Sequence, residues 1–236
     1  MSTVYLVPSV LAPDATATIP AYVLDAVKAC QVIFAENERT ARRFLKSLDR
    51  NIVIDDFEWF AIHKSENDQV NLFRKKIAEN RNIAIISEAG CPGVADPGQV
   101  LVEAAQEMNC IIRPLVGPSS ILLALMASGM NGQQFEFIGY LPIDNMERNK
   151  KIKELEASSA KHNSTKIFIE TPYRNNQLLE SIISNCNGET KLCIASNITG
   201  AGEQIITRSI SFWMNNKPEL HKQPVIFLLY AGSRHQ

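Results

Sequence analysis

The first half of the chain alternates short apolar runs with amphipathic stretches. The runs lie at residues 4–7, 31–34, 52–54, 83–86 and 111–112. The segments between and behind them carry apolar side chains at helical spacing, at residues 21–28, 39–48, 70–79 and 100–108. We expect the runs to be strands. Strands that alternate with helices predict a mainly parallel sheet with crossover helices, so the expected fold class is α/β.

A second set of elements begins past residue 128. Its apolar runs lie at residues 135–138, 166–169, 192–195, 204–207 and 225–230. A charged stretch at 146–161 and a helix carrying Leu178, Leu179, Ile182 and Ile183 separate the first three of these runs. The later runs follow one another with short connections, which predicts antiparallel pairs and a mixed sheet. We therefore expect two domains, residues 1–118 and 119–236.

One loop stands out by its content of glycine and proline. It follows the run at residues 83–86 and reads Ser87-Glu88-Ala89-Gly90-Cys91-Pro92-Gly93-Val94-Ala95-Asp96-Pro97-Gly98; we call it the 87–98 loop. Since a helical pattern follows it, the loop is expected at the carboxyl end of a strand, where open α/β sheets bind ligands. Gly90 and Gly93 would let a flat adenine or ribose lie against main chain. A tight strand-to-helix turn with no ligand explains the same composition equally well.

Composition excludes some classes of function. The chain carries 24 basic and 25 acidic residues, for a net charge of −1, so no global field draws it toward nucleic acid or membrane. Any RNA contact must be local. The five cysteines form no C-x-x-C pair, which suits a reducing compartment. The amino terminus lacks a basic n-region, and no apolar run approaches the about 18–20 residues of a membrane span. We therefore expect a soluble cytoplasmic protein without a membrane segment.

Motifs for phosphate and metal binding are absent from the sequence. There is no G-x-x-x-x-G-K-[ST], and no G-x-G-x-x-G follows the first run, which disfavours a nucleoside triphosphate or a dinucleotide as ligand. H-E-x-x-H is also missing. The histidines lie far apart, at His63, His162, His221 and His235. No metal site is expected.

The 87–98 loop resembles the S-D-A-G-T-P-x-x-x-D-P-G motif of the tetrapyrrole methylase superfamily, with Glu88 and Cys91 in place of the Asp and the Thr. Within that superfamily it is most similar to the ribosomal RNA small subunit methyltransferase I branch. Other blocks resemble that branch in the same order. They are residues 35–39 (A-E-D-T-R), Ile62-His63 (the L-H of L-H-E-H-N), 117–120 (G-P-S-A), 137–142 (F-x-G-F-L-P) and 170–174 (E-S-P-H-R). The resemblance covers nearly the whole chain.

This resemblance implies a two-domain, tetrapyrrole-methylase-like fold with a Rossmann-like first sheet and a mixed second sheet. It also implies an S-adenosylmethionine-dependent methyltransferase that forms a homodimer, with both domains contributing to a cofactor cleft. The residues that it assigns to the cofactor are Pro8, Glu88, Ala89, Gly90, Cys91, Pro92, Val94, Ser119, Ser120, Ile138, Ala195 and Pro224. For the two serines, a plain N-cap role at the next helix is an alternative.

The chemistry of methyl transfer demands few side chains. A sulfonium donor leaves as a neutral molecule, so the enzyme mainly has to hold donor and acceptor in line at about 3 Å. If the acceptor is a ribose hydroxyl, a carboxylate that takes or orients its proton helps, and Glu36 or Glu38 beside Arg39 is the first candidate. A surface ion pair at a helix start explains these residues equally well. The leading acceptor is RNA in a ribosomal subunit; the alternatives are a small tetrapyrrole-like molecule, or a cofactor-binding dimer without catalysis.

Three blocks depart from the branch and limit what it implies about the acceptor. The first loop, P-T-P-I-G-N-L, reads Pro8-Ser9-Val10-Leu11-Ala12-Pro13 here and loses its glycine. The E-I-T-K block reads Asn197-Ile198-Thr199-Gly200, and the K-G-E block reads Lys222-Gln223-Pro224. The resemblance also stops before the small helical domain that the ribosomal enzymes carry.

Basic side chains cluster on one expected helix. Arg39, Arg42, Arg43 and Lys46 recur at steps of three and four and could meet phosphates. A solvated charged face is the favoured interpretation, because four acids follow closely, at Asp49, Asp55, Asp56 and Glu58. Lys150, Lys151 and Lys153 form a second cluster with the same interpretation.

Overall fold

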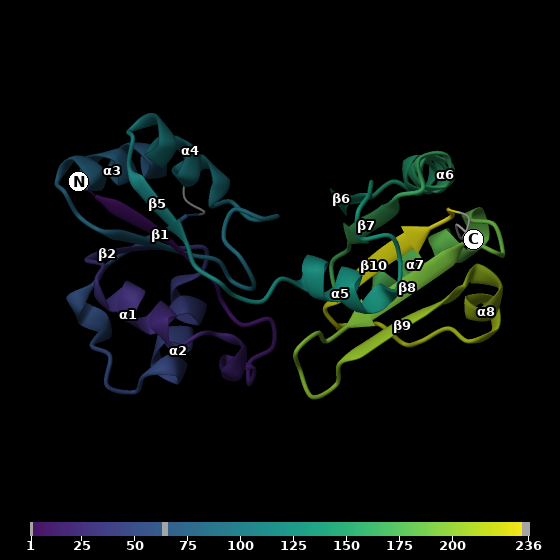
Figure 1. Ribbon diagram of the computed structural model, residues 1–236, viewed down its shortest axis with the longest axis horizontal. Coiled ribbons are helices and arrows are strands. Elements are labelled where there is room, and N and C mark those ends of the chain that lie inside the picture. The colour runs from purple at the N-terminus through teal and green to yellow at the C-terminus, as the bar shows by residue number, and fades with distance from the viewer. Residues whose placement is uncertain (1, 63–65, 233–236) are drawn as a thin grey trace. The chain divides into compact units, whose positions relative to one another are not determined.

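The computed structural model describes residues 2–62 and 66–232. His63, one half of the Ile62-His63 match, and His235 lie outside the described residues. The chain divides into two compact units, Met1–Ser119 and Ser120–Gln236 (Figure 1). Each unit has its own sheet of five strands.

The first unit is an α/β layer structure with a parallel sheet. Its strands are β1 (Thr3–Val7), β2 (Val32–Ala35), β3 (Glu58–Ala61), β4 (Ile83–Ile86) and β5 (Ile111–Pro114). Its helices are α1 (Tyr22–Lys28), α2 (Glu38–Leu48), α3 (Glu66–Ala78) and α4 (Gln99–Glu107), with 3-10 turns η1 (Thr16–Thr18) and η2 (Ile54–Asp56). The strand order is β3-β2-β4-β1-β5, and every neighbouring pair is parallel. The predicted mainly parallel sheet is confirmed.

Helices cover both faces of this sheet, which is why its central strands are apolar throughout. All four residues of β4 are fully buried. Helices α1 and α2 pack on one face, against Ile33 and Ala84, and helices α3 and α4 pack on the other, against Phe34 and Ile85 (Figure 1). A strand buried on both faces has no position for a polar side chain, so it appears in the sequence as a continuous apolar run.

The strand predicted at residues 52–54 is wrong. That segment leads into η2, and the strand beside β2 is β3, which begins with Glu58 and pairs it with Val32. Ile52 is buried in the cluster under α1 and α2, so its apolar character comes from packing in a connection. The indole Nε1 of Trp59 donates to the carbonyl of Ile54 at 2.9 Å, which ties this connection to β3. A run of three apolar residues does not distinguish a buried connection from a strand.

The second unit has a mixed sheet, as predicted. Its strands are β6 (Phe135–Tyr140), β7 (Thr165–Ile169), β8 (Lys191–Ser196), β9 (Gln204–Ser209) and β10 (Val225–Tyr230). Its helices are α5 (Ser120–Ser128), α6 (Asn145–His162), α7 (Asn175–Asn185) and α8 (Ile210–Asn215). In the order β6-β7-β10-β8-β9, only the β6–β7 pair is parallel.

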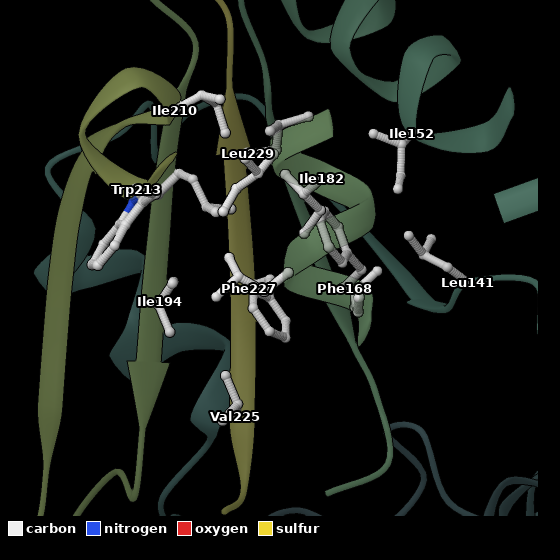
Figure 2. Packing of buried hydrophobic residues seen from close by; sticks show 14 of the residues in the cluster. Leu141, Ile152, Phe168, Ile182, Ile194, Ile210, Trp213, Val225, Phe227 and Leu229 are labelled. Atoms are coloured by element: carbon white, nitrogen blue, oxygen red, sulfur yellow. The ribbon is translucent and has the colours of Figure 1, made fainter. Parts of the chain in front are cut away.

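The core of the second unit lies between the sheet and helices α6, α7 and α8. Phe168 of β7 and Phe227 of β10 stack with ring centroids 6.0 Å apart at its centre (Figure 2). Trp213 of α8 is buried at one side, where its Nε1 donates to the carbonyl of Leu192 at 2.9 Å. Helix α5 contacts β9 and β10, and its Ser128 carbonyl accepts from the hydroxyl of Thr207.

Candidate functional site

Loops that follow β1, β4 and β5 leave the same edge of the first sheet, because these strands are parallel neighbours. Strand β1 is followed by α1 on one face of the sheet, and β4 is followed by α4 on the other. Two adjacent strands whose connections diverge in this way mark a topological switch point, the usual place for a ligand in such sheets. The 87–98 loop lies at this point.

The 87–98 loop is fixed to the loop after β1 by paired hydrogen bonds. The backbone N–H of Ser9 donates to the carbonyl of Gly90 at 2.8 Å, and the N–H of Gly90 donates back to Ser9 at 3.2 Å. The Ser9 hydroxyl donates to the carbonyl of Ser87 at 2.8 Å, and the Ser87 hydroxyl donates to Gly90 at 3.1 Å. Both serines are buried. Ser9 therefore holds the loop at its first turn.

Glycines permit the close backbone approach at this edge. Gly90 and Gly93 adopt φ of +74° and +79°, a region that side-chain-bearing residues rarely enter. A Cβ on Gly117 would lie 2.2 Å from Cβ of Pro8, so only glycine lets the loop after β5 pack on that proline. A Cβ on Gly90 would lie 3.3 Å from the side chain of Leu11. The main chain of the loop is therefore packed closely on its two neighbours.

Asp96 shapes the second half of the 87–98 loop. Its Oδ1 accepts from the backbone N–H of Gly93 and of Gly98, both at 2.8 Å. Its Oδ2 is buried and has no hydrogen-bond partner among the described residues. Burial raises the pKa of this carboxyl, and the two N–H donors oppose that rise. The loop thus carries a buried carboxylate oxygen that is still able to accept a hydrogen bond.

A second hydrogen-bond network joins the loop to the start of α2. Oε2 of Glu36 accepts from the backbone N–H of Glu88 at 2.7 Å. The Glu88 carboxylate in turn accepts from Nδ2 of Asn37 at 3.3 Å and from the hydroxyl of Thr40 at 3.2 Å. Asn37 is also the N-cap of α2, since its Oδ1 accepts from the N–H of Thr40. Glu88 therefore contacts the start of the helix that carries two of the predicted catalytic residues, Glu38 and Arg39.

The three predicted catalytic residues differ in their surroundings. Oε2 of Glu36 accepts from the backbone N–H of Glu88 in the 87–98 loop. Glu38 pairs with Arg42 at 3.5 Å, and both side chains are about 40% exposed, so this pair contributes little to stability. Arg39 is exposed and forms no ion pair in residues 2–62 and 66–232.

The predicted cofactor residues of the first unit divide by exposure. Pro8, Gly90 and Pro92 are buried, Glu88, Ala89 and Val94 are exposed, and Cys91 and Ser119 are half-buried. The Cys91 thiol donates to the carbonyl of Pro118 at 3.6 Å, and burial, with the nearby Asp96 carboxylate, raises its pKa. This thiol is therefore protonated at neutral pH and links the 87–98 loop to the loop after β5.

Of the predicted residues of the second unit, Ala195 and Pro224 lie toward one edge of its sheet. Because β10 is antiparallel to β7 and β8, the amino end of β10 lies at the carboxyl ends of those strands. Ala195 pairs with Ile226 there, and the carbonyl of Pro224 accepts from the N–H of Asn197 at 3.0 Å. Ile138 lies at a bulge of β6, between Phe137 and Gly139. Ser120 begins α5.

A buried ion pair follows β7 at the same edge. The Glu170 carboxylate, with a side chain only 1% exposed, accepts from Nη2 of Arg174 at 2.6 Å and from Nε at 3.1 Å. It also accepts from the backbone N–H of Thr171. These bonds fix the turn that carries Tyr173, a residue that is 70% exposed and whose ring meets the ring of His221 edge-on at 5.8 Å.

Some residues that organise the site were not among the predicted ones: Ser9, Asn37, Thr40 and Asp96. Asp96 had a local signal, because an Asp placed before a Pro-Gly pair often accepts backbone N–H groups in a turn. Asn37 also had one, since it stands directly before the helical pattern. The partners of Ser9 and Thr40 lie 78 and 48 residues away, beyond the reach of any local pattern.

Three further features concern metal ligands, thiols and membrane spans. Among the described residues, no group of three or more histidines, cysteines or carboxylates is placed to hold a metal ion. All five cysteines are free thiols. No helix in the described part of the chain is both long and apolar enough to cross a membrane.

Most of the chain matches one protein family and a group of curated proteins. The family described as tetrapyrrole (corrin/porphyrin) methylases matches residues 4–211. A ribosomal RNA small subunit methyltransferase I of Vibrio cholerae is 30% identical over 183 residues, which is 77% of this chain and 60% of that protein. The enzyme of the same name from Bacillus subtilis is 29% identical over 211 residues, covering 89% of this chain and 68% of that protein. The chain thus spans about 60% of the length of the first of these curated relatives.

Solved structures share the fold at low sequence identity. The methyltransferase CobJ matches 97% of this chain and 93% of its own, with a TM-score of 0.64 and 19% identity. A uroporphyrin-III C-methyltransferase from Thermus thermophilus, complexed with S-adenosyl homocysteine, matches 98% of this chain and 97% of its own, with a TM-score of 0.58 and 11% identity. With a family match over residues 4–211 and this fold, the chain belongs to the tetrapyrrole methylase family.

Proposed function

We propose that this protein is an S-adenosylmethionine-dependent methyltransferase whose acceptor is RNA, in particular a ribose 2'-hydroxyl of small-subunit ribosomal RNA. The observation that carries the proposal is the 87–98 loop, which lies at a switch point and is fixed by Ser9 and Glu36. The acceptor is inferred from the relatives, which are named ribosomal RNA small subunit methyltransferases I and match 77–89% of this chain.

The loop has the properties that an adenosyl ligand requires. Gly90 and Gly93 present main chain without side chains, and Ala89 and Val94 offer small apolar contacts. The buried Oδ2 of Asp96 is an unused acceptor in the same loop. The solved relative with S-adenosyl homocysteine supports this choice of ligand. S-adenosylmethionine, when bound, supplies a methyl group on a sulfonium, and the task left to the protein is positioning.

A ribose hydroxyl must lose its proton when it accepts a methyl group. Glu38 is the carboxylate that we assign to this proton, since Glu36 is engaged by the N–H of Glu88 at 2.7 Å, whereas Glu38 makes only a longer, exposed pair with Arg42 at 3.5 Å. Arg39, exposed and unpaired within the described ranges, stands next to it and would stabilise the negative charge that develops on the oxygen. We assign Glu36 to the placement of the loop.

Two measurements test the proposal. Calorimetric titration should give saturable heat with S-adenosylmethionine and with S-adenosylhomocysteine, and labelled methyl should then appear in small ribosomal subunits that lack the modification. Absence of heat with both nucleosides would remove the methyltransferase class. Heat without labelling of the subunits would leave the donor and remove the RNA acceptor.

A small tetrapyrrole-like acceptor is the second candidate. It is favoured by the solved tetrapyrrole methylases, which this chain covers almost completely, whereas it spans about 60% of the Vibrio cholerae RNA methyltransferase. Labelling of uroporphyrinogen III in place of ribosomal subunits would establish it. The departures at Ser9–Ala12 and Asn197–Gly200 are compatible with a binding protein without catalysis, which would give heat and no labelled product with either acceptor.

We further propose that the protein acts as a homodimer in the cytoplasm. The free thiols suit a reducing compartment, and ribosomal subunits are present there. Sedimentation equilibrium should give twice the chain mass of 26.3 kDa, and a species at the chain mass would remove the dimer.

A further inference from the structure

Three basic side chains form a continuous surface along helix α2. Arg39, Arg43 and Lys46 are spaced four and three residues apart, so they lie on one side of the helix, and all three are exposed. The opposite side of α2 packs into the core through Ala41, Phe44 and Leu45. We call the three exposed residues the α2 basic stripe.

Arg42 does not belong to this stripe. Its guanidinium lies 4.8 Å from the centre of the Trp59 ring and pairs with Glu38. A cation over an aromatic face is held by the ring and is less available to an external anion. The sequence placed Arg42 with the other three residues, and the structure separates it from them.

The acids that would neutralise the stripe are mostly engaged elsewhere. Asp49 pairs with Lys28 at 2.8 Å, and Glu58 pairs with Lys76 at 2.5 Å and with Arg81 at 2.9 Å. Asp55 and Asp56 lie in η2, outside α2, and form no ion pair with the stripe. In the part of the chain that the structure describes, Arg39, Arg43 and Lys46 face no carboxylate within ion-pair distance, although the Nζ of Lys46 donates to the carbonyl of Arg50 at 3.1 Å. The stripe is thus a solvated charged face, as expected, but none of its three cations forms an ion pair with these acids; Lys46 only contributes, after Lys28, to the lowered pKa of Asp49.

The stripe starts beside the 87–98 loop. Thr40, the neighbour of Arg39, donates its hydroxyl to Glu88 of that loop at 3.2 Å, and Asn37 caps the helix and donates to the same carboxylate. Helix α2 is therefore held in a fixed position relative to the loop. A single-stranded RNA lying along the stripe would have one of its nucleotides close to the 87–98 loop.

We propose that the α2 basic stripe binds consecutive phosphates of the RNA acceptor. This inference rests on the proposed function and names the surface by which the RNA would be held. Guanidinium groups match phosphate oxygens in geometry, and contacts of this kind place an RNA without reading its sequence. With a net charge of −1, the molecule as a whole does not attract RNA, so a local surface has to do so.

The test is the salt dependence of binding to a short, labelled, single-stranded RNA. The doubly substituted protein Arg43→Gln/Lys46→Gln should lower the slope of log K against log salt by about 1.4, because each phosphate contact on a single strand contributes about 0.7. Adding Arg39→Gln should lower it by a further ~0.7. The loss of affinity should be the same for RNAs of different sequence, since phosphate contacts are not sequence-specific.

Arg42→Gln is the matched control, because it removes the same charge from the same helix outside the stripe and should leave the slope unchanged. A slope that stays at the wild-type value in Arg43→Gln/Lys46→Gln would overturn the inference and return the stripe to a solvated or protein-facing surface. Titration of the same variant with S-adenosylhomocysteine separates this result from a failure of the proposed function. Intact donor binding and subunit labelling, with an unchanged slope, would mean that another surface holds the RNA.

Discussion

The backbone N–H of Glu88 donates to Oε2 of Glu36 at 2.7 Å, which connects the end of β2 to the 87–98 loop across 52 residues of sequence. This contact separates two roles for Glu36. A residue that takes a proton needs an ionisable carboxylate, whereas a residue that positions a loop needs only an acceptor oxygen.

Substitution of Glu36 by Gln and by Ala distinguishes these roles. Glu36→Gln keeps an amide oxygen in place, so we expect donor affinity within about 3-fold of wild type, because the bond to Glu88 persists in neutral form. Glu36→Ala removes the acceptor, and we expect donor affinity to fall about 10-fold, the equivalent of roughly 1.4 kcal/mol. Calorimetric titration with S-adenosylhomocysteine measures both. If Glu36→Gln binds the donor normally and yet loses turnover as completely as Glu36→Ala, Glu36 is the base.

Gly117→Ala should destabilise the first unit. The new Cβ would lie 2.2 Å from Pro8 and 3.7 Å from its Cα, which forces the two loops apart. Overpacking of this kind costs about 1–3 kcal/mol. The chain has two tryptophans, one in each unit, so urea unfolding followed by Trp59 fluorescence in a Trp213→Phe background reports on the first unit. The control is Gly132→Ala in the second unit, where a Cβ meets nothing within 4 Å; followed by Trp213 fluorescence in a Trp59→Phe background, it should change stability by less than about 0.5 kcal/mol. Equal effects at the two positions would contradict the packing argument.

Asp96→Asn should alter how stability depends on pH. Burial raises the pKa of Asp96 in the folded protein above its unfolded value of 3.8, so the native state binds this proton more tightly than the unfolded chain. The free energy of unfolding therefore loses a contribution from Asp96 as the pH rises from 3.8 through the folded pKa. Asn does not titrate and still accepts from Gly93 and Gly98. We expect the stability of the variant, relative to wild type, to increase over that interval and to stay constant above it. Urea unfolding at several pH values measures this difference, and a difference that is independent of pH would contradict it.

Arg174→Ala should leave a buried carboxylate without its cation. Glu170 has a side chain only 1% exposed, and Arg174 supplies two of its hydrogen bonds. We expect a loss of about 2–4 kcal/mol in the free energy of unfolding, the upper part of that range applying to a fully buried pair. The control is Lys217→Ala, which breaks an exposed pair with Glu180 and should cost less than about 1 kcal/mol. Trp213 fluorescence follows both variants in the second unit. Similar losses for the two variants would show that Glu170 is solvated.

The sheet strands could largely be predicted because burial on both faces leaves a continuous apolar signal. Ile83–Ile86 shows that signal clearly, and the glycine loop behind it was identified by the same local pattern. The strand Glu58–Ala61 was missed because it lies at the sheet edge, is only partly buried and begins with a charged residue. Ile52 gave the false signal, since burial in a connection selects the same residue type as burial in a strand.

The bonds that hold the candidate site together could not be predicted. Glu36 appeared in the sequence as a carboxylate near a helix start, and its contact with Glu88 depends on β2 and β4 lying side by side. Arg42 appeared equivalent to Arg43, because helical spacing does not show that Trp59 takes up one side of the helix. Local sequence patterns identify candidate site residues. The role of each residue depends on its contacts with segments that are distant in the sequence.

The order of the first sheet has a consequence for how the chain is made. Strand β1 is flanked only by β4 and β5, so its Val4 pairs with Ile83 and with Ile112. While the ribosome is still extending the chain toward β4, β1 has no strand beside it on either side. Unpaired strand edges invite association between nascent chains, and pairings this distant in sequence form slowly. A chain that stops before Ile83 would therefore be a substrate for chaperones and proteases, and the Ser9–Gly90 contact of the 87–98 loop cannot form until Gly90 has been made.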